Sequence, residues 1–458
     1  MNTHQHSIVG IKSAIGFLAR WVRGRGWVLL LVLCLSPEVA QAQLRLPSVN
    51  LPATPRINTI NANNLRGNIE PLLNTAVDDA VSLTDLRLAH TTELLRAHRD
   101  VLESDQHGEP VIRHEILVWS PDSAARAAVL TAGLVIASEY PLDGLDQTLM
   151  VLRVPDDMKT ADALTHLRAL DHDAYFDFNH VYTGSSSMPT DEVTPALDAP
   201  VPEANKNIAV GLIDGGVDSK HVVFKNANLR RWGCNGREHA SEHGTAVAAL
   251  MVGRSEPFHG VAPHGTLFAA DIYCDNPKGG SAADIAQALG WMAHEKVGVI
   301  NLSLVGPPNQ LLERVVNLMI QRGHLLVAAV GNDGPAAPPL YPASYPGVVG
   351  VSAVDARRHP LPEAARGPQV MFAAPGSNMV TAALGAPPYR QVRGTSFAAP
   401  IVATMLASYL PHPDKDAAKI AMLALAQLAS GNNQPILGDE FGYGIVGEAY
   451  RIDPMRLR

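Results

Sequence analysis

Four polar residues in the second half of the chain have the types that nucleophilic catalysis requires. Asp214 and Asn332 each lie at the end of an apolar run, beside a glycine. His243 and Ser396 each lie at the start of a segment that is rich in small residues. A serine hydroxyl is a weak nucleophile until a base takes its proton, and a histidine oriented by a carboxylate can be that base. An amide side chain can donate a hydrogen bond to an oxyanion. Together these residue types predict attack of a serine on a carbonyl carbon, provided that the fold brings them to one place.

Taken singly, these residues have ordinary structural explanations. Ser396 could be the N-cap of a packed helix, and Asp214 could close an Asx turn. The chemical interpretation therefore depends on the elements that position the four residues.

The second half of the chain has the pattern of a doubly wound α/β fold. Strands are expected at four near-continuous apolar runs, Ile208–Ile213, Val297–Leu304, Leu325–Val330 and Val348–Val354. Helices are expected between them, at Ala282–His294 and Leu311–Gln321. Strands that are apolar throughout and alternate with helices predict a mostly parallel sheet that is covered on both faces. Ligands bind such sheets beyond the carboxyl ends of the strands, where Asp214 and Asn332 fall.

Residues 112–183 predict a separate, small α+β domain. Strands are expected over Ile116–Trp119, Leu134–Glu139, Thr148–Val154 and Ala174–Tyr182. Helices are expected over Ser123–Thr131, with Ser120 or Asp122 as N-cap, and over Ala161–Leu170. With a turn at Asp143-Gly144, the order βαββαβ is the ferredoxin-like arrangement. Upstream, Asp85–Leu102 has apolar residues at helical spacing and predicts one amphipathic helix capped by Thr84.

The N-terminus has the layout of a secretory signal peptide. Lys12 and three arginines precede the apolar run Trp27–Leu35, and Val39-Ala40-Gln41-Ala42 follows as a small-residue cleavage site. The run is short for a membrane span, so we expect cleavage after Ala42, no stable membrane insertion afterwards, and a periplasmic or secreted protein. An uncleaved anchor is the alternative, because the region before the run is long.

These patterns divide the chain into six parts. The expected order is a signal peptide (1–42), a linker (43–83), the amphipathic helix with its connection (84–111), the small domain (112–183), a second linker (184–206) and the large domain (207–458).

Composition excludes one class of function and leaves one question of redox chemistry open. Of the 458 residues, 47% are apolar and 17% charged, which suits a sizeable core in two or three domains. A net charge of −8 without a basic stripe gives no footprint for nucleic acid, so no nucleic-acid partner is expected. Beyond the signal segment, Cys234 and Cys274 form either a disulfide or two buried thiols.

The motifs of the large domain resemble those of the subtilisin-like serine peptidases, in which Asp, His and Ser follow one another in this chain order. The matching segments are Ile213-Asp214-Gly215-Gly216-Val217, His243-Gly244-Thr245, Gly331-Asn332 and Gly394-Thr395-Ser396-Phe397-Ala398-Ala399-Pro400. Three more resemble the substrate-binding segments and a C-terminal element of the family, namely Asn301-Leu302-Ser303-Leu304, Tyr341-Pro342-Ala343-Ser344-Tyr345-Pro346 and Gly442-Tyr443-Gly444. Each motif is weak alone, but seven in order, from about Ile208 to Ala449, are specific.

The resemblance implies a role for each candidate residue. Ser396 would be the nucleophile, His243 the base that later protonates the leaving amine, and Asp214 the group that orients His243. Asn332 and the backbone N–H of Ser396 would form the oxyanion hole. No cofactor and no metal are expected.

Three differences from the family pattern touch no catalytic group. Gly215 stands where the family usually has Ser or Thr, and Ala246-Val247-Ala248-Ala249 replaces His-Val-Ala-Gly. Residues 253–260 form a short loop without the Asn-rich insertion that binds calcium in many relatives, so that calcium site is not expected.

A rival motif overlaps the candidate base. His239-Ala240-Ser241-Glu242-His243 fits the H-x-x-E-H pattern of some zinc proteases. That pattern needs one continuous helix that carries both histidines. Gly233, Gly236 and Gly244 oppose such a helix.

Four residues are expected to bind substrate, namely Ser303, Leu304, Val305 and Leu340. By the resemblance, Val305 replaces a common glycine, and Leu340 lies near the floor of the pocket for the residue before the cut. Both add bulk, which predicts a narrow apolar pocket for small or medium uncharged side chains. Shifts of neighbouring residues could instead restore the space.

The small domain resembles the propeptide of the same family, a folding chaperone and temporary inhibitor. The segment 175–181 resembles its last strand, which runs on into the cleft. Tyr182 is then expected in the apolar pocket four places upstream of the cut, and Gly184 or Ser185 in the narrow pocket. We therefore expect self-cleavage between Gly184 and Ser187; the alternative is a permanent N-terminal binding domain.

The sequence thus predicts an exported serine endopeptidase, made as a self-processing precursor. Its partners would be protein or peptide substrates and its own N-terminal domain. One alternative is a catalytically silent fold that acts as a binding or scaffolding protein, which is disfavoured because all four catalytic positions are filled. Another is a maturation protease dedicated to one partner, and the sequence leaves broad and dedicated specificity both open.

Overall fold

The computed structural model describes residues 87–184, 208–431 and 437–452. The predicted signal peptide, the linker after it and Thr84 lie outside these residues, as do the predicted cleavage positions from Ser185 to Ser187. Within the described ranges, no helix has the length and apolar character that a membrane span requires. All described residues belong to one compact unit.

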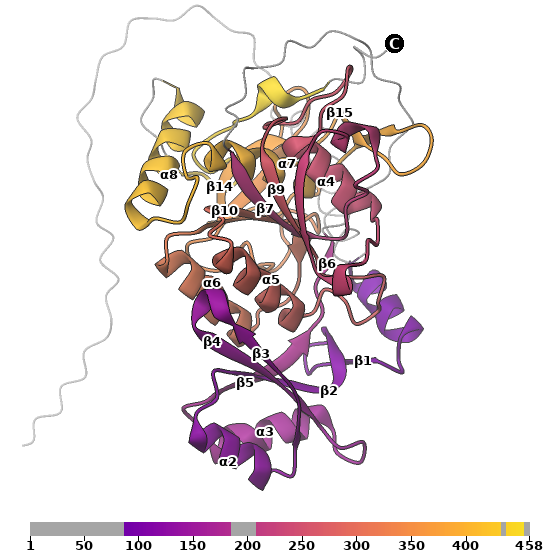
Figure 1. Cartoon of the computed structure of the whole chain (residues 1–458), viewed down its shortest axis with the longest axis vertical. Helices are drawn as coiled ribbons and strands as arrows, with labels where there is room; N and C mark the ends of the chain where they lie inside the picture. The colour runs from indigo at the N-terminus through magenta and orange to yellow at the C-terminus, as the bar shows by residue number, and fades with distance from the viewer. Residues whose placement is uncertain (1–86, 185–207, 432–436, 453–458) are drawn as a thin grey trace, which may run out of the picture. The chain divides into compact units, whose positions relative to one another are not determined.

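A helix and a ferredoxin-like domain make up residues 87–184 (Figure 1). After the helix at residues 87–97, the elements are β1 (Leu102–Ser104), β2 (Pro110–Trp119), α2 (Ser123–Thr131), β3 (Val135–Leu142), η1 (Asp143–Leu145), β4 (Gln147–Arg153), α3 (Thr160–Leu170) and β5 (Tyr175–His180). The strands pair antiparallel in the order β3-β4-β2-β5, and α2 and α3 share one apolar core with one face of this sheet. Of the two predicted caps of α2, Asp122 is the one that accepts the Ala125 N–H.

The predicted helix Asp85–Leu102 was wrong at its C-terminal end. The helix ends at Ala97, and Leu102 begins β1, which pairs antiparallel with β2. The cause is an Asx turn, because the Asp105 carboxylate accepts the N–H groups of His107 and Glu109 at 2.8 Å and holds a hairpin there. Leu102 is thereby buried in a small apolar cluster.

Residues 208–452 contain a parallel sheet of seven strands in the order β14-β13-β12-β10-β7-β9-β8. Its strands are β7 (Ala209–Asp214), β8 (Asn228–Trp232), β9 (Thr266–Asp271), β10 (Val299–Leu302), β12 (Leu325–Ala329), β13 (Val349–Val354) and β14 (Val370–Pro375). The helices are α4 (Glu242–Val252), α5 (Ala282–His294), α6 (Gln310–Gln321), α7 (Thr395–Ala407) and α8 (Lys415–Ser430). Two small antiparallel pairs complete it, β6 (Thr183–Gly184) with β11 (Leu304–Val305) and β15 (Met379–Ala382) with β16 (Tyr389–Val392).

Helices cover both faces of the large sheet, which confirms the predicted doubly wound fold (Figure 1). Leu212 points into the core that contains α4 and α7, while the next residue, Ile213, points into the core that contains α5 and α6. This alternation explains why the strands are apolar throughout. The second core also contains Leu117 and Leu149, so the ferredoxin-like sheet packs against the same helices.

Candidate active site

Asp214 and His243 meet at the carboxyl end of β7. Both carboxylate oxygens of Asp214 lie 2.9 Å from Nδ1 of His243, and Asp214 is buried. His243 lies in the first turn of α4, whose N-cap Ser241 accepts the Gly244 N–H at 3.0 Å. A Cβ atom on Gly244 would lie 2.1 Å from the carbonyl oxygen of Gly215, so only glycine allows α4 to approach β7 this closely.

The second ring nitrogen of His243 is the one suited to take a proton. Because Nδ1 faces a carboxylate, it carries the hydrogen, which leaves Nε2 as an acceptor. Nε2 is buried and has no hydrogen-bond partner among the described residues. The His243 ring lies 5.6 Å from that of Phe397, the residue after Ser396. The first turns of α4 and α7 therefore face each other.

Ser396 is buried in the first turn of α7, after Gly394 at a φ of 139°. Pro400 is the sixth residue of this helix and therefore lies inside it. An N–H at position 400 would bond the carbonyl of Ser396, and proline has none. The Ser303 hydroxyl donates to that carbonyl instead, at 3.1 Å, and itself accepts from Asn301 at 2.8 Å. The candidate substrate-binding residue Ser303 thus fixes the turn that carries the candidate nucleophile.

Asn332 follows β12 and is tied to the same turn. Its Oδ1 accepts the N–H of Thr395 at 2.9 Å, and the Thr395 hydroxyl accepts the N–H of Gly331 at 3.3 Å. The oxygen of the Asn332 side chain is thus bonded to the turn that carries Ser396.

The two bulky residues predicted for the narrow pocket converge on Gly331. A Cβ atom on this glycine would lie 2.5 Å from Cδ1 of Leu340 and 3.6 Å from Cγ1 of Val305. Both side chains are buried. Leu304 and Val305 also form β11, which pairs with Gly184 and Thr183 of β6.

The zinc-protease pattern lacks the helix that it needs. α4 begins at Glu242, so His239 lies in the loop before it, and His243 is bonded to Asp214 through Nδ1. In the described ranges, ligand atoms of Cys234, Asp271 and Cys274 lie close enough to hold a metal. Those two cysteines form a disulfide, however, which removes the thiolates that a metal would bind.

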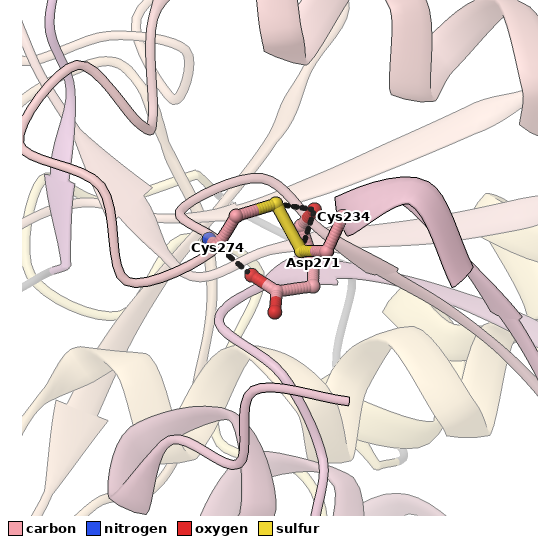
Figure 2. Close-up of side chains that lie close together, drawn as sticks. All are labelled: Cys234, Asp271 and Cys274. Carbon is pink, nitrogen blue, oxygen red and sulfur yellow. Dashed lines mark hydrogen bonds between the residues drawn. A yellow bond between two sulfur atoms is a disulfide. The ribbon is translucent and has the colours of Figure 1, made fainter. Parts of the chain in front are cut away.

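Asp271 is a buried acid that the sequence analysis missed. It ends β9 directly beside Asp214. Its Oδ1 accepts the N–H groups of Tyr273 and Cys274 at 3.0 Å, and the bond from Cys274 is drawn in Figure 2. Both sulfur atoms of the disulfide lie 3.7 Å from the carbonyl oxygen of Asp271. These contacts are not hydrogen bonds, because a disulfide has no thiol hydrogen to donate. Burial raises the pKa of the Asp271 carboxyl, and the charge of Asp214 adds to the rise. The apolar run Leu267–Ala270 that precedes this acid could have identified it.

Comparison with known proteins places this chain in a family. Residues 205–444, more than half of the chain, match the Subtilase family, Peptidase S8. The chain is 32% identical over 211 residues to the minor extracellular protease Epr of Bacillus subtilis and 31% identical over 217 residues to subtilisin E of that species. These matches cover 44% and 45% of this chain, and 32% and 56% of the two relatives.

The fold of fervidolysin from Fervidobacterium pennivorans, a keratinolytic enzyme related to subtilisin, is similar, with a TM-score of 0.62 and 20% identity. The structural similarity covers 76% of this chain and 62% of fervidolysin. Residues from 205 onwards make up less than 76% of the chain, so the similarity also includes part of the N-terminal region. The chain therefore spans less than two thirds of the length of each of these three proteins. Since the family match takes in more than half of its residues, this chain belongs to the subtilase family.

Proposed function

We propose that this protein is a serine endopeptidase, with Ser396 as nucleophile, His243 as general base and Asp214 as the group that orients the base. The observation that carries the proposal is the contact of both Asp214 oxygens with Nδ1 of His243, on a ring whose Nε2 is buried without a partner among the described residues. A fluorophosphonate tests it, since an active serine hydrolase reacts with this probe and a silent fold does not.

Each residue has a defined step in the proposed reaction. Nε2 of His243 takes the hydroxyl proton of Ser396 as Oγ bonds to the scissile carbonyl carbon, and Asp214 stabilises the imidazolium. The NH₂ group of Asn332 and the N–H of Ser396 donate to the oxyanion. The C–N bond then breaks as His243 returns the proton to the leaving amine. Water hydrolyses the ester on Ser396 with His243 again as base.

The N-terminal region would be the inhibitor of its own precursor. β6 pairs antiparallel with β11, with Gly184 opposite Leu304, as an added strand does in peptide recognition. Tyr182 is fully buried; its hydroxyl donates to the carbonyl of Pro307 and its N–H to that of Gly280, both at 2.8 Å. Residues 182–184 thus lie between two segments of the large domain as a peptide substrate would.

Polar contacts at two helix ends support inhibition by the ferredoxin-like domain. The Asp177 carboxylate accepts the N–H of Gln310 in the first turn of α6 at 2.7 Å. Asn179 accepts the N–H of Ala283 in the first turn of α5 at 3.1 Å. Helix N-termini have unpaired N–H groups and a partial positive charge, so these acceptors suit both sites. A domain held this way would stay bound after cleavage between Gly184 and Ser187 and would need separate release.

Export is part of the same proposal. It is supported by the sequence pattern of residues 1–42 and by the disulfide between Cys234 and Cys274, since such bonds persist in oxidising compartments.

The narrow pocket gives a prediction about specificity. We expect the residue before the cut to be small or medium and uncharged, because Leu340 and Val305 both press against Gly331. Leu340→Ala should raise kcat/KM for a peptide with Phe at this position about tenfold relative to one with Ala, since a few methylene groups of space change discrimination by that much or more. A peptide-library digest measures the preference. A strong preference of the wild-type protein for Phe, Tyr, Arg or Lys would contradict this description of the pocket.

The helix at residues 87–97 makes a second contact near the candidate oxyanion hole. Arg87 pairs with Asp333, the residue after Asn332, at 3.3 Å, and with Glu109 at 3.2 Å. Burial raises the pKa of Asp333, and the Arg87 charge opposes that rise. The side chains of Arg87 and Asp333 are only 21% and 13% exposed, so solvent screens this pair less than a surface pair.

Arg87→Gln should therefore weaken inhibition. We expect peptidase activity to appear several-fold faster after synthesis of the precursor. The reason is that losing this ion pair should weaken binding of the N-terminal region to the large domain by about 1 kcal/mol. The matched control is Arg96→Gln, because the side chain of Arg96 is 64% exposed and pairs with Glu93 of its own helix. Equal rates of activation for the two variants would show that the Arg87 contact does not hold the precursor closed.

A further inference from the structure

Residues 182–184, the part of the N-terminal region that lies between two segments of the large domain, border a cavity beside His243 and do not fill it. A Cβ atom on Gly184 would meet no heavy atom of the described residues within 4 Å, and the backbone of Gly184 does not have the positive φ that favours glycine. The adjoining cavity has a volume of about 460 Å³ and is lined by both Gly184 and His243. A long side chain at this position would have room to enter it.

The charges around this cavity favour a cation. The lining residues that ionise are Asp214, Asp271, Asp275 and the histidines His98, His239 and His243, with no lysine or arginine among the described lining residues. The charge of Asp214 is directed to His243. Asp275 is exposed, and Asp271 is buried in the wall. The described lining thus has three carboxyl groups and no permanently positive side chain.

A buried carboxylate oxygen of Asp271 gives a second, independent reason to expect a cation in this cavity. Asp271 is 9% exposed, and although Oδ1 accepts two N–H groups, Oδ2 is buried without a hydrogen-bond partner among the described residues. The hydroxyl of Tyr273, in the same wall, is likewise buried and unpartnered within the described part of the chain. Buried polar atoms without partners are costly, and a cation nearby would offset the cost of the carboxylate.

We propose that this cavity binds a lysine or arginine side chain of the substrate, with Asp271 and Asp275 attracting its charge. The residue that carries it takes the place of Gly184 and is followed by the small residue before the cut, so that Tyr182 remains four places upstream. The proposal rests on the proposed peptidase function and specifies its substrate class. Because position 184 is a glycine, the N-terminal region of this chain places no side chain in the cavity. A substrate that carries a cation there would therefore compete well against the cleaved N-terminal region.

Peptides built on the chain's own sequence, Val-Tyr-Thr-X-Ser-Ser-Ser, test the proposal with X as Lys, Gln or Gly. We expect kcat/KM for the Lys peptide to exceed that for the Gln peptide at least tenfold. In Asp271→Asn the ratio of these two values should fall close to one. The matched control is Asp355→Asn, because Asp355 also accepts N–H groups of its own turn, those of Arg357 and His359, and does not line this cavity. Equal cleavage of the Lys and Gln peptides would overturn the proposal.

A second measurement does not depend on catalysis. In the full chain carrying Ser396→Ala, adding Gly184→Lys should raise Tm by about 2 °C or more, and Asp271→Asn should cancel the rise. Gly184→Gln is the neutral control. If Lys and Gln at position 184 gave the same Tm, the cavity would have no preference for a cation, whether or not the wild-type protein hydrolyses peptides.

Discussion

Replacement of Ser396 with alanine is expected to abolish peptide hydrolysis, fluorophosphonate labelling and processing of the precursor together. Removal of the nucleophile of a catalytic triad lowers turnover by about 10⁴-fold or more. Alanine removes only the hydroxyl, and the backbone contacts of the turn, from Ser303 to the Ser396 carbonyl and from Thr395 to Asn332, remain. The variant should therefore accumulate as a folded, full-length precursor, which gel mobility and intact mass will show.

Ser408→Ala is the control for this experiment. Ser408 lies just past the end of the same helix, is exposed, and bonds locally to the Met405 carbonyl. The Ser408→Ala variant should react with the fluorophosphonate, hydrolyse peptides and process its precursor like the wild type. Processing of purified Ser396→Ala at the wild-type rate would refute self-cleavage by Ser396.

Asp214→Asn is expected to lower kcat about 10⁴-fold with little change in KM. Asparagine keeps the size of the side chain, but its NH₂ group can face Nδ1 of His243 and so favour the imidazole tautomer with the hydrogen on Nε2, which cannot take the serine proton. The effect should be this large because both oxygens of Asp214 now lie 2.9 Å from Nδ1. Steady-state kinetics on a peptide substrate measures it.

The control is Asp218→Asn, four residues along the chain, where the carboxylate accepts the N–H of Lys220 in a local turn. This variant should keep wild-type kcat. A loss of less than tenfold in Asp214→Asn would show that this carboxylate does not set the tautomer of His243.

Much of the fold was predictable because local signals agreed with the tertiary packing. α5 has the predicted bounds, since Ser281 and Asp284 form a capping box that defines its start. The strands β7, β10, β12 and β13 were predictable because burial on both faces demands apolar residues throughout. Of the candidate catalytic residues, Asp214 ends β7, and His243 and Ser396 lie in the first turns of α4 and α7, positions that the apolar runs and small-residue segments of the sequence indicate.

Other features depend on contacts that a local pattern does not contain. β8 was missed because it is an edge strand, and Arg230 and Arg231 are exposed there rather than apolar. The end of the N-terminal helix was misplaced because the Asx turn of Asp105 competes with helical propensity. The bond from Ser303 to the Ser396 carbonyl joins residues 93 positions apart, so only the folded chain reveals how the missing N–H of Pro400 is replaced.

Mass-spectrometric mapping of the fluorophosphonate adduct on the purified active protein tests the central claim most directly. We predict a single adduct on Ser396, in a species whose N-terminus lies between Ser185 and Ser187. An adduct on another residue, or full peptidase activity without an adduct, would contradict the assignment of Ser396 as the nucleophile.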